Sequence, residues 1–107
     1  MVFFYLEIGG NVTEAQYQAK LTKKLKAKFP GCILLKNDPS YQQGILDWTL
    51  LVGEKWAALE VKASENSPIQ PNQEYFVERL SEMSFAAFIY PENEAEVIRA
   101  LEQALAP

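Results

Sequence analysis

ILDWTLLVGEKWAALEVK, residues 45–62, holds two apolar segments on either side of Gly53-Glu54. Segments 45–52 and 55–62 are rich in aliphatic and aromatic residues, a composition typical of β-strands. Glycine accepts the positive φ that the first position of a type II′ turn requires, so Gly53-Glu54 fits a two-residue loop. The stretch therefore predicts an antiparallel hairpin.

The turn at Gly53-Glu54 also determines which side chains face each other. Continuing the ladder from this turn places Asp47 opposite Glu60, with Cβ atoms about 4.5–5.5 Å apart. Lys62 follows Glu60 by two residues and therefore points to the same face of the strand. A change of one residue in loop length would reverse these faces. A solvent-facing Glu-Lys strand edge with an unrelated Asp is thus the alternative interpretation.

Opposed carboxylates at Asp47 and Glu60 point to a bound cation. Facing like charges are destabilising, and a divalent cation between them would remove the repulsion. The chain has no His and a single Cys, which argues against a structural zinc site and favours a hard ion with oxygen ligands, Mg²⁺, Mn²⁺ or Ca²⁺. Such an ion would activate a water, and Lys62 could orient or deprotonate that water or stabilise the transition state.

The flanking sequence predicts helices around this hairpin. Thr13 and Gln16 fit a capping box that begins a helix ending at 29–31, and Pro71 suits the first position of a second helix. We expect the second helix to bury Phe76, Val77, Leu80 and Met83. A third helix within 93–106 is capped by Asn93 and Glu96 and buries Val97, Ile98, Leu101 and Leu105.

The remaining apolar runs read as strands. Residues 32–35 form a short strand, and 85–90 is a continuous apolar run typical of a strand covered on both faces. Residues 1–10 read as an additional N-terminal strand closed by two glycines. The chain of 107 residues is thus predicted to be one domain of the α/β (α+β) class: an N-terminal strand (1–10), a core with a mixed sheet (12–90) and a C-terminal helix (93–106).

Two further side chains are candidates for the same site. Glu14 lies almost two helical turns before Leu21 and shares its stripe, so it could be another metal ligand; a first-turn Glu that complements the helix dipole is the alternative. Gln73 lies one turn before Phe76 and Val77, at the start of the second helix. It could contact the scissile phosphate or an attacking water, or cap the helix.

The net charge of −4 at first argues against nucleic acid as a partner. Residues 1–64, however, carry eight lysines against six acidic residues, a net charge of +2, whereas residues 65–107 carry two arginines against eight glutamates, a net charge of −6. A local basic field can bind phosphates even on an acidic protein. A solvated helix face explains a lysine run equally well.

The motif Gly44-Ile45-Leu46-Asp47, followed by Glu60-Val61-Lys62 and Ala63-Ser64, resembles the PD-(D/E)XK nuclease superfamily. Glu14 and Gln73 extend the similarity to the VRR-NUC branch and to small phage endonucleases related to Holliday junction resolvases. The resemblance implies an αβββαβ restriction-endonuclease-like core. It implies that Asp47, Glu60, the Val61 carbonyl and Glu14 hold Mg²⁺, and that Lys62 is the catalytic lysine. Leu46 departs from the proline that many members carry before the Asp.

These observations lead to the expectation of a Mg²⁺-dependent endonuclease that hydrolyses DNA phosphodiester bonds, acting on branched DNA such as Holliday junctions. Its catalytic residues would be Asp47, Glu60, Lys62, Glu14 and Gln73; its DNA contacts would be Lys20, Lys24, Lys36 and Ser64. We expect a homodimer in the cytoplasm of a bacterial or phage-infected cell, with no membrane association. The alternatives are a non-catalytic nucleic-acid-binding module on the same fold and a small protein-interaction domain.

Overall fold

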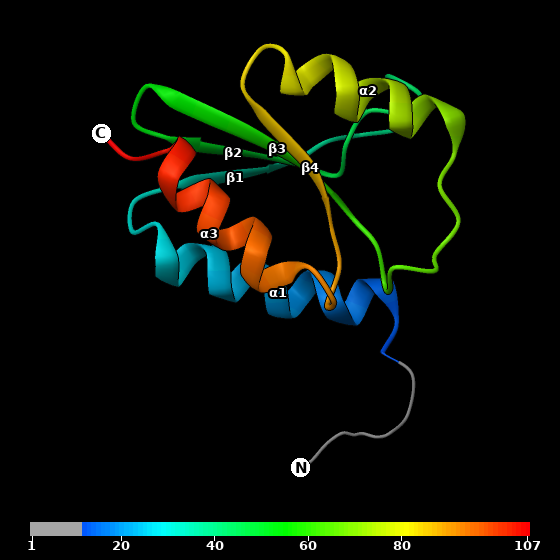
Figure 1. The fold of residues 1–107 in the computed structure, drawn as a ribbon, viewed down its shortest axis with the longest axis horizontal. Coiled ribbons are helices and arrows are strands. Elements are labelled where there is room, and N and C mark those ends of the chain that lie inside the picture. Colours follow the sequence, from blue (N-terminus) through cyan, green and yellow to red (C-terminus); the bar gives the residue numbers. More distant parts are fainter. Residues whose placement is uncertain (1–11) are drawn as a thin grey trace.

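The computed structural model describes residues 12–107 and contains three helices and four strands (Figure 1). In chain order the elements are α1 (Glu14–Lys28), β1 (Ile33–Lys36), β2 (Trp48–Val52), β3 (Lys55–Val61), α2 (Pro71–Ser81), β4 (Phe85–Ile89) and α3 (Glu94–Ala104). This mixed α+β arrangement confirms the predicted fold class and is compatible with an αβββαβ core followed by a C-terminal helix. The predicted strand at 1–10 lies outside the described residues.

The four strands form one sheet in the order β1-β2-β3-β4. The first two pairings are antiparallel, and the β3–β4 pairing, reached through α2, is parallel. Val52 faces Lys55, and the ladder continues to Trp48 facing Leu59, which is the predicted register. Gly53 has φ +60°, the positive value that the tight turn requires.

The helices cover the two faces of the sheet unequally (Figure 1). On one face lie α1 and α3, which form the main core with alternate residues of β2, β3 and β4. On the other face α2 packs against β3 and β4. Because side chains alternate along a strand, Leu59 and Val61 enter the main core while Glu60 between them points toward the α2 side.

Local signals in the sequence explain where the helices begin. The Thr13 side chain accepts from the Gln16 backbone, and the Gln16 side chain accepts from the Thr13 backbone, so the predicted capping box is present. Pro71 is the first residue of α2, as predicted. All four apolar residues assigned to the third helix are buried, which confirms its inward stripe: Val97, Ile98, Leu101 and Leu105.

Some details differ from the sequence-based expectation. Met83 lies beyond the end of α2 and is 56% exposed, so its predicted burial is wrong. Phe76, Val77 and Leu80 are only half-buried, so the expected burial of the second helix is incomplete there too. In β4 only Ile89 is buried and the other four residues are half-buried, because β4 is an edge strand of the sheet. Asn93 precedes α3, but its side chain does not cap the helix: it bonds to the backbone of Phe88 and Tyr90.

The contact between α1 and α3 is polar at one end. The Tyr17 hydroxyl donates to Glu94 at 2.8 Å, and Lys24 forms an ion pair with the same carboxylate. Burial, followed by the hydrogen bond to Glu94, raises the pKa of Tyr17 well above its usual range. Among residues 12–107, no helix combines the length and the apolar character needed to cross a membrane.

Candidate active site

The sequence-predicted residues converge where β2 begins and β3 ends. Asp47 directly precedes β2, Glu60 is the penultimate residue of β3, and Lys62 directly follows β3. Gln73 is the third residue of α2, the helix that covers this part of the sheet. Glu60 and Lys62 are the buried charged residues of the described chain, with exposed fractions of 3% and 7%. Side chains from three separate segments therefore meet in one polar patch, in which Glu60 and Lys62 are buried and Asp47 and Gln73 are half-buried.

Gln73 connects Glu60 and Lys62 within this patch. Its Nε2 donates to Glu60 Oε2 at 2.9 Å, and its Oε1 accepts from Lys62 Nζ at 2.8 Å. The same Oε1 accepts from the Gln70 backbone at 3.1 Å, which closes the first turn of α2. The Lys62 ammonium also lies 3.7 Å from Glu60 Oε2. The helix-capping alternative is thus realised in Gln73, whose side-chain amide also contacts Glu60 and Lys62.

Asp47 occupies the end of the β2–β3 ladder. Its Oδ2 accepts from the Val61 backbone N–H at 2.8 Å, and its Oδ1 lies 3.3 Å from the ammonium of Lys36. Lys36 also donates to Gln18 on α1 at 3.0 Å. The N–H and C=O of one strand residue point to the same side, so the Val61 carbonyl faces the Asp47 side as well.

Electrostatics couple Glu60 to Asp47. Burial and then the negative charge of Asp47 raise the pKa of Glu60 to about 7 from a usual value near 4.5. Lys62 opposes this shift but does not cancel it. A buried carboxyl that ionises only near neutral pH is one that an additional positive charge would stabilise in its ionised form.

The oxygen atoms of this patch suit a hard divalent cation. Two carboxylates, Asp47 and Glu60, and one backbone carbonyl, Val61, form an all-oxygen donor set of the kind Mg²⁺ and Mn²⁺ prefer. The raised pKa of Glu60 means that Lys62 does not fully offset the cost of ionising this carboxyl, a cost that a nearby cation would reduce. Within residues 12–107, however, no three His, Cys, Asp or Glu side chains lie close enough to form a metal-binding group, so water or substrate would have to complete the coordination.

Glu14 lies near enough for its charge to act on Glu60, but no hydrogen bond or ion pair among residues 12–107 joins it to the patch. It lies exposed in the first turn of α1, where a negative charge complements the helix dipole. Its charge adds only the smallest contribution to the raised pKa of Glu60. Glu14 is on the same side of α1 as the buried Leu21, but the first turn of α1 extends beyond the core, so the Glu14 side chain is exposed to solvent.

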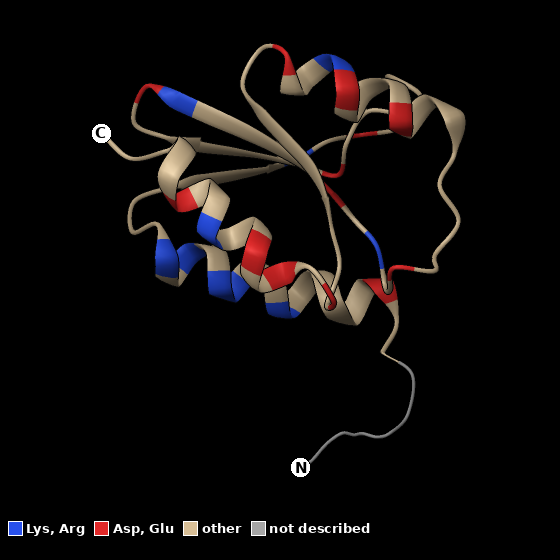
Figure 2. Ribbon diagram, in the orientation of Figure 1, with Lys and Arg blue, Asp and Glu red and all other residues tan. Residues whose placement is uncertain are grey.

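The four expected DNA contacts lie in different environments. Lys36 stands beside Asp47 at the edge of the patch, whereas Lys20 is exposed on α1 and Lys24 is paired with Glu94 of α3. The Ser64 hydroxyl accepts from the Asn66 backbone in the turn after β3. Figure 2 shows the lysines along α1 next to the acidic residues of α3. This pairing lowers the net positive field of the helix.

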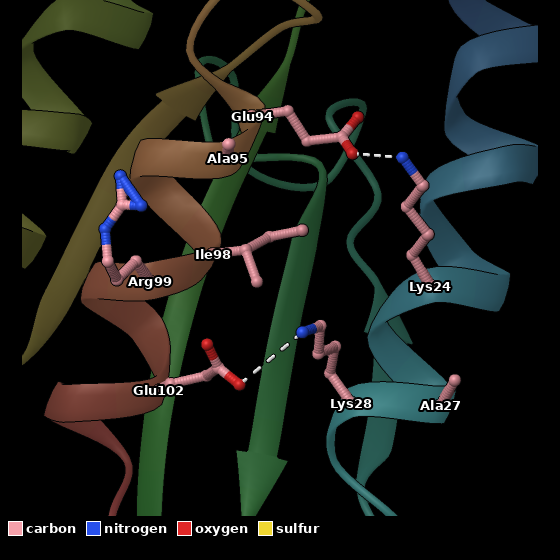
Figure 3. A pocket seen from close by; sticks show the side chains of 8 residues that line it. All are labelled: Lys24, Ala27, Lys28, Glu94, Ala95, Ile98, Arg99 and Glu102. Atoms are coloured by element: carbon pink, nitrogen blue, oxygen red, sulfur yellow. Dashed lines mark hydrogen bonds and ion pairs between the residues drawn. The ribbon is translucent and has the colours of Figure 1, made fainter.

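A groove of about 590 Å³ lies between α1 and α3, away from the Asp47–Glu60 patch (Figure 3). Two ion pairs cross it, Lys24 with Glu94 and Lys28 with Glu102, the second at 3.8 Å. Ile98 points into the groove between these pairs, while Arg99 points away from them (Figure 3). The groove shares no residue with the buried polar patch and presents mutually compensated charges, so we assign it no chemistry.

Two contacts of the site were absent from the sequence-based prediction. Lys36 was expected to bind DNA, but its ion pair with Asp47 and its bond to Gln18 were not foreseen. The register of β1 on β2 pairs Lys36 with Trp48, the residue after Asp47. That register depends on the loop between the strands, whose length alone does not reveal the pairing.

Comparisons of this chain with protein-family models, with curated proteins and with solved structures gave no match.

Proposed function

We propose that this protein is a metal-dependent endonuclease that hydrolyses DNA phosphodiester bonds, as its resemblance to PD-(D/E)XK nucleases implies. The observation that carries the proposal is the buried patch formed by Asp47, Glu60, Lys62 and Gln73. Burying two carboxylates next to an ammonium costs stability. Groups in such an arrangement are concentrated at functional sites. Phosphodiester hydrolysis needs such groups, to bind a cation and to neutralise charge on the phosphate.

Each residue has a role that follows from its contacts. Asp47 and Glu60, with the Val61 carbonyl, would hold Mg²⁺; when bound, this ion supplies an activated water and a Lewis acid for the phosphoryl oxygen. Lys62 is held by Gln73 and Glu60, and its ammonium would stabilise the negative charge that develops on the phosphate. Gln73 orients both partners. Glu14 is not assigned a direct role.

The substrate that we propose is branched DNA, bound by a homodimer. A described body of only 96 residues offers little surface for reading a long sequence, so recognition of DNA shape is the simpler mode. Two copies would supply two sites for the two strands of a junction. Lys36 beside the patch is the lysine best placed to contact a phosphate next to the scissile bond.

A cleavage assay with matched variants tests this function. Four-way-junction and linear DNA are incubated with the protein in Mg²⁺ and in Mn²⁺. The wild type is expected to cleave the junction, and Asp47→Asn, Glu60→Gln and Lys62→Met are each expected to lose at least 100-fold in rate, on the order of the loss of a transition-state contact. Glu102→Gln, an exposed acid on α3, is the control. Absence of cleavage by the wild type, or equal cleavage by all variants, contradicts the proposal.

A non-catalytic nucleic-acid-binding module is the second candidate, and one observation favours it. Gln73 satisfies Glu60 and Lys62 by direct hydrogen bonds, so the patch is self-consistent without a cation. Junction binding in Ca²⁺ together with no turnover in Mg²⁺ or Mn²⁺ would identify this function. A protein-interaction domain would show no DNA affinity even at low salt, where phosphate binding is strongest.

A further inference from the structure

The loop before β2 approaches the first turn of α2 more closely than a side chain allows. At Gly44, φ is +88°, and a Cβ built on its backbone would lie 2.4 Å from Asn72 Cβ. It would also lie 3.0 Å and 3.1 Å from the carbonyl carbon and oxygen of Asn72. The two other described glycines with positive φ, Gly31 and Gly53, have open space at the same position. Gly44 is therefore required for a close contact as well as for its backbone conformation.

Both sides of this contact carry residues of the buried polar patch. Gly44 precedes Asp47 by three residues, and Leu46 between them is fully buried, which ties the loop to the body of the protein. The Asn37 side chain further fixes the loop by donating to the Leu46 carbonyl at 2.8 Å. On the other side, Asn72 directly precedes Gln73, whose amide contacts Glu60 and Lys62.

We propose that Gly44 is a positioning residue, which sets the first turn of α2 at the distance that places the Gln73 amide between Glu60 and Lys62. The loop before β2 positions Asp47 and, through the Gly44–Asn72 contact, also determines the position of Gln73. The two halves of the site, one from β2–β3 and one from α2, are thereby held in a single geometry. The catalytic part of this inference rests on the proposed nuclease function; the positioning itself does not.

Space beside the contact determines how a larger residue would act. A cavity of about 320 Å³ adjoins the contact and is lined by Gln43, Gly44, Gln70, Pro71, Asn72 and Gln73. Because the first turn of α2 borders this cavity, the turn can shift into it when a larger residue stands at position 44. A methyl group at position 44 is therefore expected to displace the helix start and its Gln73, while the main core on the opposite sheet face stays intact.

The test compares Gly44→Ala with Gly31→Ala and Gly53→Ala, which place the same methyl at positive φ but in open space. The first readout is the side-chain amide NMR signal of Gln73, which a hydrogen bond to a buried carboxylate shifts and protects from exchange. Only Gly44→Ala is expected to lose this shift and protection. An unchanged Gln73 signal in Gly44→Ala overturns the proposal, whether or not the protein cleaves DNA.

The second readout is junction cleavage under saturating and subsaturating DNA. Gly44→Ala is expected to lower kcat by about 10- to 100-fold with KM within about twofold, as for a displacement on the order of 1 Å at a catalytic group. The two control variants are expected to keep wild-type rates within about twofold. Equal losses in all three variants would mean that backbone strain alone is responsible. An inactive wild type contradicts the nuclease function and leaves the NMR comparison valid.

A compensating substitution gives an independent check. Asn72→Gly removes the Cβ that lies nearest to the added methyl, so Gly44→Ala/Asn72→Gly is expected to regain part of the Gln73 signal and of kcat relative to Gly44→Ala. Asn72→Gly alone is the control for weakening of the helix start. If Gly44→Ala fails to fold, restored folding in the double variant supports the contact, whereas a double variant as unfolded as the single one contradicts it.

Discussion

Gln73 Nε2 lies 2.9 Å from Glu60 Oε2, and this bond joins the first turn of α2 to the end of β3. The bond matters because Glu60 is almost completely buried and carries a carboxyl whose ionised form is poorly compensated. A neutral amide can donate to Glu60 and accept from Lys62 at once, which a carboxylate or an ammonium at position 73 could not do.

Replacement of Gln73 by Ala should weaken both the fold and the site. The change leaves two buried charged groups, Glu60 and Lys62, without a hydrogen-bond partner, at an expected cost of about 1–3 kcal/mol in the free energy of unfolding. Urea denaturation at pH 7 measures this loss. Gln70→Ala, which alters the adjacent helix cap but leaves the amide in place, is the control. A loss in Gln73→Ala no larger than in Gln70→Ala would count against the bridging role.

The raised pKa of Glu60 predicts a specific dependence of stability on pH. Below pH 4.5 the carboxyl is protonated in both folded and unfolded chains, so it adds no pH dependence. Between about pH 4.5 and 7 the unfolded chain releases the proton while the folded protein retains it, so stability falls as pH rises. Above about pH 7 both forms are ionised and the loss is complete, at about 3 kcal/mol.

Comparison with Glu60→Gln isolates this effect, because glutamine does not titrate. In metal-free buffer, the wild type is expected to lose stability relative to Glu60→Gln between pH 4.5 and 7. Denaturant unfolding at several pH values provides the measurement. A constant difference between the two proteins across this range would show that the Glu60 carboxyl has an ordinary pKa.

Divalent cations should stabilise the folded protein when Glu60 is ionised. At pH 8, a free Mg²⁺ concentration ten times its Kd is expected to add about 1.4 kcal/mol to the free energy of unfolding, and Mn²⁺ should act similarly. At pH 5 the effect should be much smaller, because protons compete for Glu60. Asp47→Asn and Glu60→Gln should abolish the stabilisation while Glu102→Gln retains it. A cation-dependent increase in the free energy of unfolding that persists in both Asp47→Asn and Glu60→Gln would mean that the cation binds elsewhere.

Lys36 and Lys24 should contribute differently to DNA binding despite similar side-chain exposure of 50% and 56%. Lys36→Ala is expected to weaken junction binding and to lower the salt-dependence slope by about 1, as for a lost phosphate contact. Lys24→Ala should change little, because Lys24 contacts Glu94 of α3 and not the Asp47 carboxylate of the proposed site. Fluorescence anisotropy in Ca²⁺ over a range of salt measures both. Equal losses of junction affinity in Lys36→Ala and Lys24→Ala would indicate that DNA lies along α1 instead of next to Asp47.

Tyr17→Phe should affect stability without affecting the site. The hydroxyl is bonded to Glu94 between α1 and α3, on the sheet face opposite Glu60, and its loss is expected to cost about 0.5–1.5 kcal/mol. Cleavage measured well below the unfolding midpoint should remain at the wild-type rate. Tyr41→Phe, at an almost fully exposed tyrosine, is the matched control and should change neither property. Reduced cleavage in Tyr17→Phe alone would connect the α1–α3 contact to the site.

Local features of the sequence determined most of the fold. The Gly53-Glu54 turn sets the hairpin register, since a two-residue loop leaves one pairing of the flanking strands, and that register places Glu60 and Lys62 on one face. Thr13 and Pro71 mark the beginnings of their helices because capping depends on residues within one turn. These signals involve residues close in sequence, so they can be recognised without knowing how the helices pack on the sheet.

The tertiary structure alone decided how the parts of the site meet. The hairpin register continues toward Asp47 and Glu60, but the ladder ends at the Trp48–Leu59 pair, and the Asp47 carboxylate accepts from the Val61 backbone. Lys36 reaches Asp47 and Gln73 reaches Glu60 through long-range packing of β1 and α2, which no spacing reveals. Glu14 shares the inward stripe yet remains in solvent, because helical phase gives direction but not depth. Sequence periodicity orients side chains; the packing of whole elements determines which of them touch.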